Sequence, residues 1–173
     1  MSQRSYLFIN VMGYQLSWWL LVCLNNNIYA LLCAALSVVT YLACERARFA
    51  SGLILIGTVL IGSGVDSLLA VSGVYGPVWQ AQGIPIWLVA LWFSFATLLN
   101  ISLKWLQERL VLAAFLGSIG GASSYWAGSQ LGAIDTLNAG DIGVLMIVWL
   151  ILTPLLLYFC KLMTCVWPLS RDE

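Results

Sequence analysis

Residues 60–68 read LIGSGVDSL and lie inside an apolar run from Ala50 to Val74. A run of this length can cross a bilayer, which takes about 20 residues of helix. Asp66 nevertheless lies well inside the run. A carboxylate at that depth costs roughly 2.5–3.5 kcal/mol on insertion scales unless it is paired, neutral or hydrated. The stretch therefore predicts a membrane-spanning helix whose acid finds partners elsewhere in the chain.

The composition indicates an integral membrane protein. Of the 173 residues, 62% are hydrophobic and only 8% are charged, whereas about a quarter of the residues in soluble domains are charged. The net charge is zero, which offers no basic surface to nucleic acid. The chain has no histidine, and its five cysteines form no C-x-x-C pair. We therefore expect no metal, no cofactor and no catalytic residue of the usual kinds.

Six apolar runs predict one all-α domain over residues 1–173, a polytopic bundle of six transmembrane helices. The expected helices cover residues 6–24, 28–44, 50–74, 84–103, 110–130 and 142–167. We expect the first run to be a retained helix, because no small-residue cleavage site follows a short apolar core.

The positive charges predict the orientation of this bundle. Six of the seven Lys and Arg residues fall before the first run, after the last, or in the two loops at residues 45–49 and 104–109. The seventh, Lys161, lies near the end of the last run. With six helices these regions share one side of the membrane. The positive-inside rule then places both termini in the cytoplasm.

Polar side chains recur at the depth of Asp66, roughly 13 Å from the outer face at 1.5 Å per helical residue. The residues that this count brings to one level, and that we predict as a ligand-binding site, are Asp66, Tyr14, Gln15, Trp92, Ser123, Ser124 and Tyr125. We expect Asp66 to face the bundle interior and to contact Tyr14, Gln15, Ser123, Ser124 or Tyr125. Whether its carboxyl group is ionised, or neutral and donating a hydrogen bond, stays open. Glycines spaced four apart predict close packing, with the helices at 50–74 and 110–130 in the interior and another helix against Gly120 and Gly121.

Several local patterns resemble a known family. They are NVMGYQ at 10–15, Asp66-Ser67, PIW at 85–87, LWF at 91–93, and SYxxG at 124–128. Together these patterns resemble a family of small bacterial inner-membrane proteins of unknown function, domain-of-unknown-function family 2878. The resemblance implies a six-helix membrane protein with no established activity, and a link to enzymes that modify membrane fatty acids.

Three hypotheses of function remain open. The first is a protein that binds or moves a small apolar or lipid-like solute through an outer-half cavity around Asp66. The second is an accessory or scaffold subunit that docks a membrane-protein partner. The third, an intramembrane enzyme, has the least support, because the sequence shows no second deep acid and no nucleophile–base pair. Membrane lipid is the expected surroundings in all three.

Overall fold

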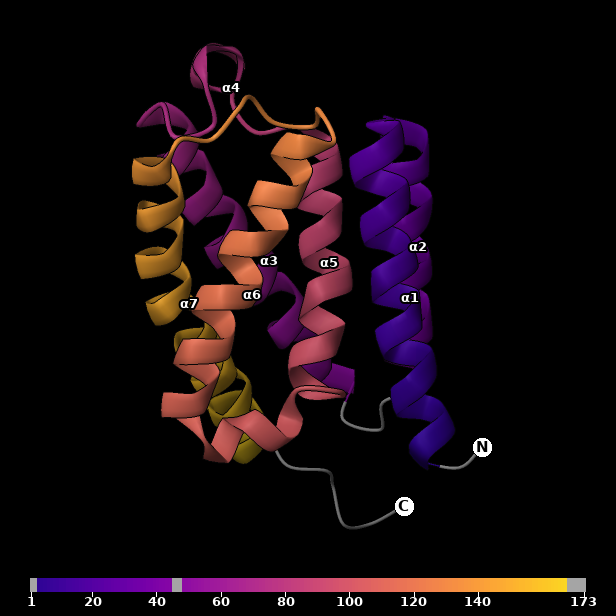
Figure 1. The fold of residues 1–173 in the computed structure, drawn as a ribbon. Helices are drawn as coiled ribbons and strands as arrows, with labels where there is room; N and C mark the ends of the chain where they lie inside the picture. The colour runs from indigo at the N-terminus through magenta and orange to yellow at the C-terminus, as the bar shows by residue number, and fades with distance from the viewer. Residues whose placement is uncertain (1–2, 45–47, 168–173) are drawn as a thin grey trace, which may run out of the picture.

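The computed structural model describes residues 3–44 and 48–167, and all the regular structure in this part of the chain is helical (Figure 1). The α-helices are α1 (Gln3–Leu24), α2 (Asn27–Cys44), α3 (Arg48–Val71), α4 (Pro77–Gln82), α5 (Ile86–Asn100), α6 (Leu110–Gln130) and α7 (Ala139–Val166), and a 3-10 helix, η1 (Lys104–Glu108), joins α5 to α6. The six expected runs therefore become the six long helices, and α4 is a short addition in the loop after α3.

Four helices are long and apolar enough to cross a membrane by length and composition, namely α1, α3, α6 and α7. The helices α2 and α5 are also apolar but shorter. Large apolar side chains cover the outside of the bundle, among them Phe8, Phe49, Phe115 and Ile147, each 60% or more exposed. A soluble monomer rarely exposes so much contiguous apolar surface. The apolar helices and this exposed surface are compatible with a helical membrane protein.

The centre of the bundle is α5, which packs against α1, α2, α3 and α7 (Figure 1). Ten of its 15 residues are buried. The expectation that α3 and α6 form the interior is wrong in part, because each keeps one exposed face. Leu60 of α3 is 68% exposed and Ile119 of α6 is 63% exposed. The sequence signal for α5 is a helix that is apolar on all sides, which is typical of a buried helix.

Two glycines allow large side chains to approach a helix backbone closely. The indole of Trp92 on α5 lies against Gly62 of α3, and the indole of Trp149 on α7 lies against Gly121 of α6, so that a Cβ atom at either glycine would overlap the ring. The predicted contact at Gly121 is confirmed. Gly120 has no atom of another helix in contact range, so the same prediction for Gly120 is wrong.

Both ends of α7 are held by polar contacts. Asn138 caps the start of α7 by accepting from the backbone N–H groups of Gly140 and Asp141, and the Asp141 carboxylate accepts from the Asn138 N–H at 2.9 Å. This reciprocal capping box satisfies donors that a helix start otherwise leaves unpaired. At the opposite end of α7, Lys161 forms an exposed ion pair with Glu108 of η1. The two ends of the bundle are called the α4 end and the Arg109 end below.

Candidate functional site

Asp66 lies in the bundle interior and is only 1% exposed. Its Oδ1 atom accepts hydrogen bonds from the hydroxyls of Tyr75 and Tyr125, each at 2.7 Å. Its Oδ2 atom accepts from the indole N–H of Trp92, also at 2.7 Å. These four residues are called the Asp66 cluster. The cluster joins α3, the loop after α3, α5 and α6 at one point.

Tyr75 reaches Asp66 because the chain reverses at the end of α3. Gly73 takes a left-handed conformation, with φ at 83°. The N–H of Val74 then donates to the carbonyl of Leu69 and the N–H of Gly73 to that of Ala70, the double bond pattern of a Schellman cap. The turn directs the Tyr75 side chain back into the bundle, where it is fully buried. Burial first, and the Asp66 carboxylate second, raise the pKa of the Tyr75 hydroxyl well above its ordinary value, so this hydroxyl stays protonated and donates.

Aromatic rings surround the cluster in two stacked pairs. Tyr75 and Tyr125 stack with centroids 5.3 Å apart, and Trp92 and Trp149 stack with centroids 5.7 Å apart. Phe95 stands nearly perpendicular to both indoles of the second pair. Gly62 of α3 lies against the outer face of Trp92, and Gly121 of α6 lies against the outer face of Trp149. The two helix backbones therefore fix the indole pair from both sides.

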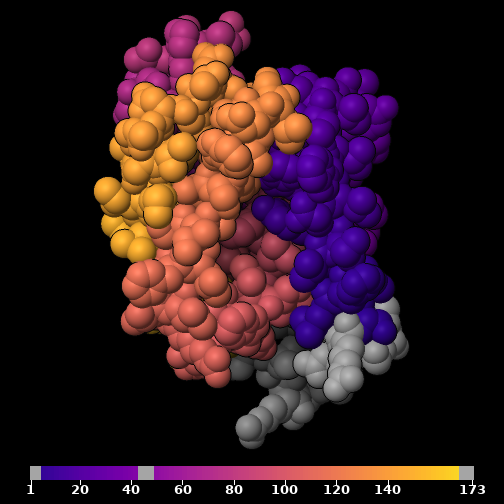
Figure 2. Space-filling model, viewed as in Figure 1, coloured from indigo at the N-terminus to yellow at the C-terminus, as the bar shows by residue number. Residues whose placement is uncertain are grey.

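A cavity of about 310 Å³ lies beside the cluster, and Trp92 and Tyr125 form part of its wall. It runs from Trp87 and Ile134, near the α4 end, to Leu106, near the Arg109 end. Figure 2 shows a hollow between α1 and α6, with deeper atoms of α5 visible at its floor. The cavity therefore opens sideways through the surface of the bundle.

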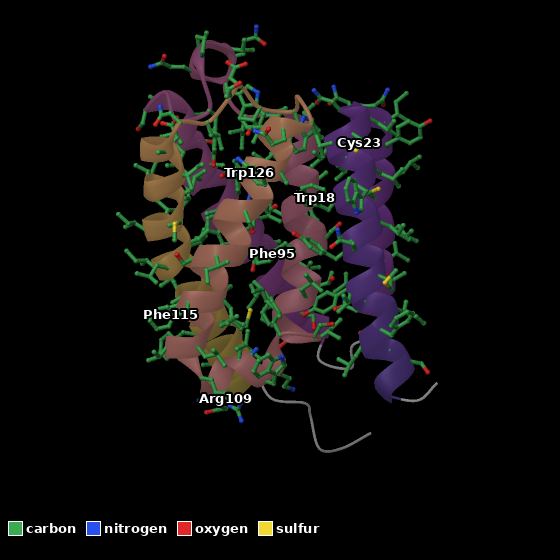
Figure 3. All side chains as sticks on the ribbon, viewed as in Figure 1. Trp18, Cys23, Phe95, Arg109, Phe115 and Trp126 are labelled. Atoms are coloured by element: carbon green, nitrogen blue, oxygen red, sulfur yellow. The ribbon has the colours of Figure 1, made fainter. Side chains whose placement is uncertain are left out.

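The mouth of the cavity has a defined upper edge. Above the hollow, the indole N–H of Trp18 on α1 donates to Ser124 Oγ on α6 at 2.9 Å. One turn before Ser124 on α6, Gly120 lines the cavity without touching another helix. In Figure 3, Phe95 lies in the gap between α1 and α6, below Trp18. The two helices thus meet at Ser124 and part at Gly120.

A model of the family described as "Protein of unknown function (DUF2878)" matches residues 7–155. The chain belongs to this family. The match contains the whole Asp66 cluster and all the residues of the cavity wall named above, and it confirms the resemblance seen in the sequence. No curated protein and no solved structure matches the chain. The family does not bring an activity with it, so the function of this DUF2878 protein has to be argued from its own site.

The structure brings together five of the seven residues predicted for the site. Tyr14, Trp92, Ser124 and Tyr125 line the cavity, and Asp66 lies behind Trp92 and Tyr125. The expected contact between Asp66 and Tyr125 is therefore present.

Gln15 and Ser123 are outside this group. Both side chains are exposed on the outer faces of their helices, and Ser123 donates to the Gly120 carbonyl of its own helix. The predicted contacts of Asp66 with Gln15 and Ser123 are not formed. Neither are those with Tyr14 and Ser124, since the carboxylate is enclosed by the cluster's three donors.

Three aromatic residues of the site were not predicted from the sequence. Tyr75 directly follows the expected helix at residues 50–74 and was left out of the predicted site, but it is buried on Asp66. Trp149 and Phe95 line the cavity and fix the position of Trp92. The sequence signal for Tyr75 was the pair Gly73 and Gly76 around it, because two glycines beside an aromatic residue indicate a chain reversal. In the structure both glycines have positive φ.

Other buried polar side chains hold the helices together away from the cavity. Asn10 of α1 donates to Thr97 of α5 at 2.9 Å and accepts from Ser102 at 2.6 Å. The Asn100 amide on α5 donates to the Tyr41 hydroxyl on α2 at 3.0 Å. Asn10 and Asn100 therefore serve helix packing, through bonds between α1 and α5 and between α2 and α5. Among the described residues no group of three or more His, Cys, Asp or Glu side chains is placed to hold a metal ion.

Proposed function

We propose that this chain is a bacterial inner-membrane protein that binds a small apolar or lipid-like molecule in the cavity between α1 and α6. The observation that carries the proposal is the cavity itself. Its volume of about 310 Å³ lies in the range of small-molecule sites. Its wall is built almost wholly from aromatic and aliphatic side chains and glycine, and none of the described residues that line it is charged.

The sideways opening supports a ligand that comes from the bilayer. The surface at the hollow is apolar on the α6 side, where Leu116 lines the cavity and is exposed. Hydrocarbon therefore surrounds the mouth when the helices stand in a membrane. A ligand that enters there does not have to cross an aqueous phase.

The proposal includes six membrane crossings with both termini in the cytoplasm. Lys104, Arg109 and Lys161 gather at one end of the bundle, and Asp135 and Asp141 lie near the other. This asymmetry supports a cytoplasmic Arg109 end. The 15 residues of α5 span only about 22 Å at 1.5 Å per residue, and η1 extends this crossing. A cytoplasmic reporter fused after Glu173 is expected to be active; activity of a periplasmic reporter at that position would contradict the six crossings.

The binding proposal is tested by filling the cavity. Gly120→Phe places a ring in the mouth of the cavity, where no neighbouring atom opposes it. Gly64→Phe is the matched control, because Gly64 lies on α3 away from the cavity and also has free space around it. Both changes replace a helical glycine, which by itself favours the helix slightly.

Native mass spectrometry of the proteins in nanodiscs or mild detergent reads out the result. We expect a retained molecule, or added lipid, on the unmodified protein and on Gly64→Phe, and a loss of at least tenfold in occupancy on Gly120→Phe. Equal occupancy in all three proteins contradicts a ligand in this cavity. Absence of any bound molecule together with a stoichiometric membrane-protein partner favours the accessory-subunit hypothesis instead.

A further inference from the structure

The Asp66 cluster places a buried acid directly behind the wall of the cavity. All three donors to the carboxylate are neutral, and Asp66 has no basic partner among the described residues. An indole N–H can only donate, and the two tyrosine hydroxyls both converge on the same oxygen atom. Both oxygen atoms of Asp66 accept in these bonds, and an ionised carboxylate is the acceptor-only form of the group. The cluster is therefore organised around a carboxylate anion whose charge no side chain balances.

Two of the three donors face the cavity on their other side. Trp92 and Tyr125 each give a hydrogen bond to Asp66 and also form the cavity wall. A hydrogen bond donated to an anion increases the electron density of the aromatic ring that donates it. In the part of the chain that the structure describes, eight aromatic residues and no basic one line the cavity. A cation is attracted to electron-rich rings.

One basic side chain, Arg109, lies against Trp105, a residue of the cavity wall at the Arg109 end of the bundle. The Arg109 guanidinium lies 5.8 Å from the ring centroid of Trp105, and Arg109 is exposed. Solvent and headgroups therefore screen its charge from the level of Trp92. This contact also shows a cation resting on one of the aromatic rings that line the cavity.

We propose that the cavity selects a lipophilic cation, an apolar molecule carrying a quaternary ammonium or similar positive centre, over a neutral molecule of the same shape. This inference rests on the proposed function, since it names the class of ligand for the same cavity. The positive centre lies against Trp92 and Tyr125, and the apolar remainder fills the space toward Leu106. At about 8 Å and an effective dielectric constant of about 20, the Asp66 charge favours the cation by about 30-fold.

The experiment compares two isosteric probes. Benzyltrimethylammonium and neopentylbenzene have the same shape. They differ at one atom, which is a positively charged nitrogen in the first and a neutral carbon in the second. Dissociation constants are measured by quenching of tryptophan fluorescence in nanodiscs, and each is multiplied by the partition coefficient of that probe into protein-free nanodiscs. The quantity compared is the ratio of the two corrected affinities, so that differences in membrane solubility cancel.

Three variants make the comparison specific. In Asp66→Asn the preference for the cation is expected to fall by about 30-fold while neopentylbenzene still binds. Tyr41→Phe removes a buried hydroxyl that bonds Asn100 away from the cavity and leaves Asp66 and the cavity wall unchanged, so the preference is expected to remain. Gly120→Phe is expected to weaken both probes. If Asp66→Asn does not fold, the unmodified protein still decides, because it is expected to favour the cation by at least tenfold after correction.

The outcomes separate this inference from the function on which it rests. Binding of both probes with no preference for the cation, or with a preference that survives Asp66→Asn, overturns the inference and leaves the apolar site standing. Failure of both probes to bind the unmodified protein removes the site and the inference together.

A lipid headgroup carries the same positive centre as a free organic cation. If phosphatidylethanolamine added to the nanodiscs competes with benzyltrimethylammonium, the natural ligand is a headgroup; if the affinity does not change, it is a free cation. Either result retains the charge preference, which the Asp66→Asn comparison alone tests.

Discussion

Replacing Asp66 by Leu tests whether the carboxylate is needed for itself or for the donors that it satisfies. The change leaves the hydroxyls of Tyr75 and Tyr125 and the indole N–H of Trp92 buried without an acceptor. Each stranded donor costs about 1–3 kcal/mol, so the three together cost roughly 3–9 kcal/mol. That is comparable with the whole free energy of unfolding of a typical protein. We expect Asp66→Leu alone to yield little folded protein.

The cost is expected to fall when the stranded donors are removed as well. Tyr75→Phe and Tyr125→Phe delete only the two hydroxyls and keep the stacked rings. Adding both to Asp66→Leu is expected to recover about 2–6 kcal/mol, because replacing both partners of a buried hydrogen bond by apolar groups is nearly neutral. In the unmodified background the same two changes are expected to be destabilising. The sign of their effect therefore reverses with the residue at 66.

Unfolding by SDS in mixed micelles, followed by tryptophan fluorescence, gives the free energies. Tyr14→Phe is the matched control, since Tyr14 lines the cavity but does not contact Asp66. It is expected to give no recovery in the Asp66→Leu background. Additive losses from Tyr75→Phe and Tyr125→Phe in both backgrounds would refute the assignment of the cost to stranded donors.

Two further changes test the packing and the mouth of the cavity. Gly121→Leu drives a side chain into the Trp149 indole, and overpacking of this kind costs about 1–3 kcal/mol or more; a clear fall in the thermal midpoint is expected, whereas Gly64→Leu, in free space on α3, is expected to leave it unchanged. Trp18→Phe removes the hydrogen bond to Ser124 while keeping an aromatic side chain. Faster dissociation of a bound probe is expected in stopped-flow quenching. An unchanged rate would mean that the bond between Trp18 and Ser124 does not restrict the mouth of the cavity.

Helix positions and the depth of each polar residue could be predicted from the sequence, because both follow from counting along the chain. Direction around the helix axis could not. Ser123 and Ser124 lie at nearly the same depth, but successive helical residues point about 100° apart. Ser124 therefore faces α1, whereas Ser123 is exposed. The small difference in hydrophobicity between the faces of a membrane helix gives little signal for this direction, and Gln15 was misplaced for the same reason.

Tyr75 escaped prediction for a different reason. Apolar character continues to Val74, so counting extended the helix to that point and placed Tyr75 at the interface. The end of α3 at Val71 depends on the left-handed turn at Gly73, and glycine is also common inside membrane helices. Only the fold distinguishes these two uses of glycine. Asp66 was identified because an acid in a membrane needs partners, but this need does not say which residues supply them.

The two walls of the cavity are held with very different strength. The wall formed by Trp92 and Tyr125 is anchored by hydrogen bonds to a buried carboxylate, and bonds to charged groups contribute about 1.5–3 kcal/mol each. The α1 wall is joined to α6 by the partly buried bond between Trp18 and Ser124, and a bond between neutral groups contributes about 0.5–1.5 kcal/mol. Separating Trp18 from Ser124 therefore costs less than disturbing the cluster. In the binding that we propose, a ligand that enters by parting these two side chains leaves Asp66 with all three of its donors.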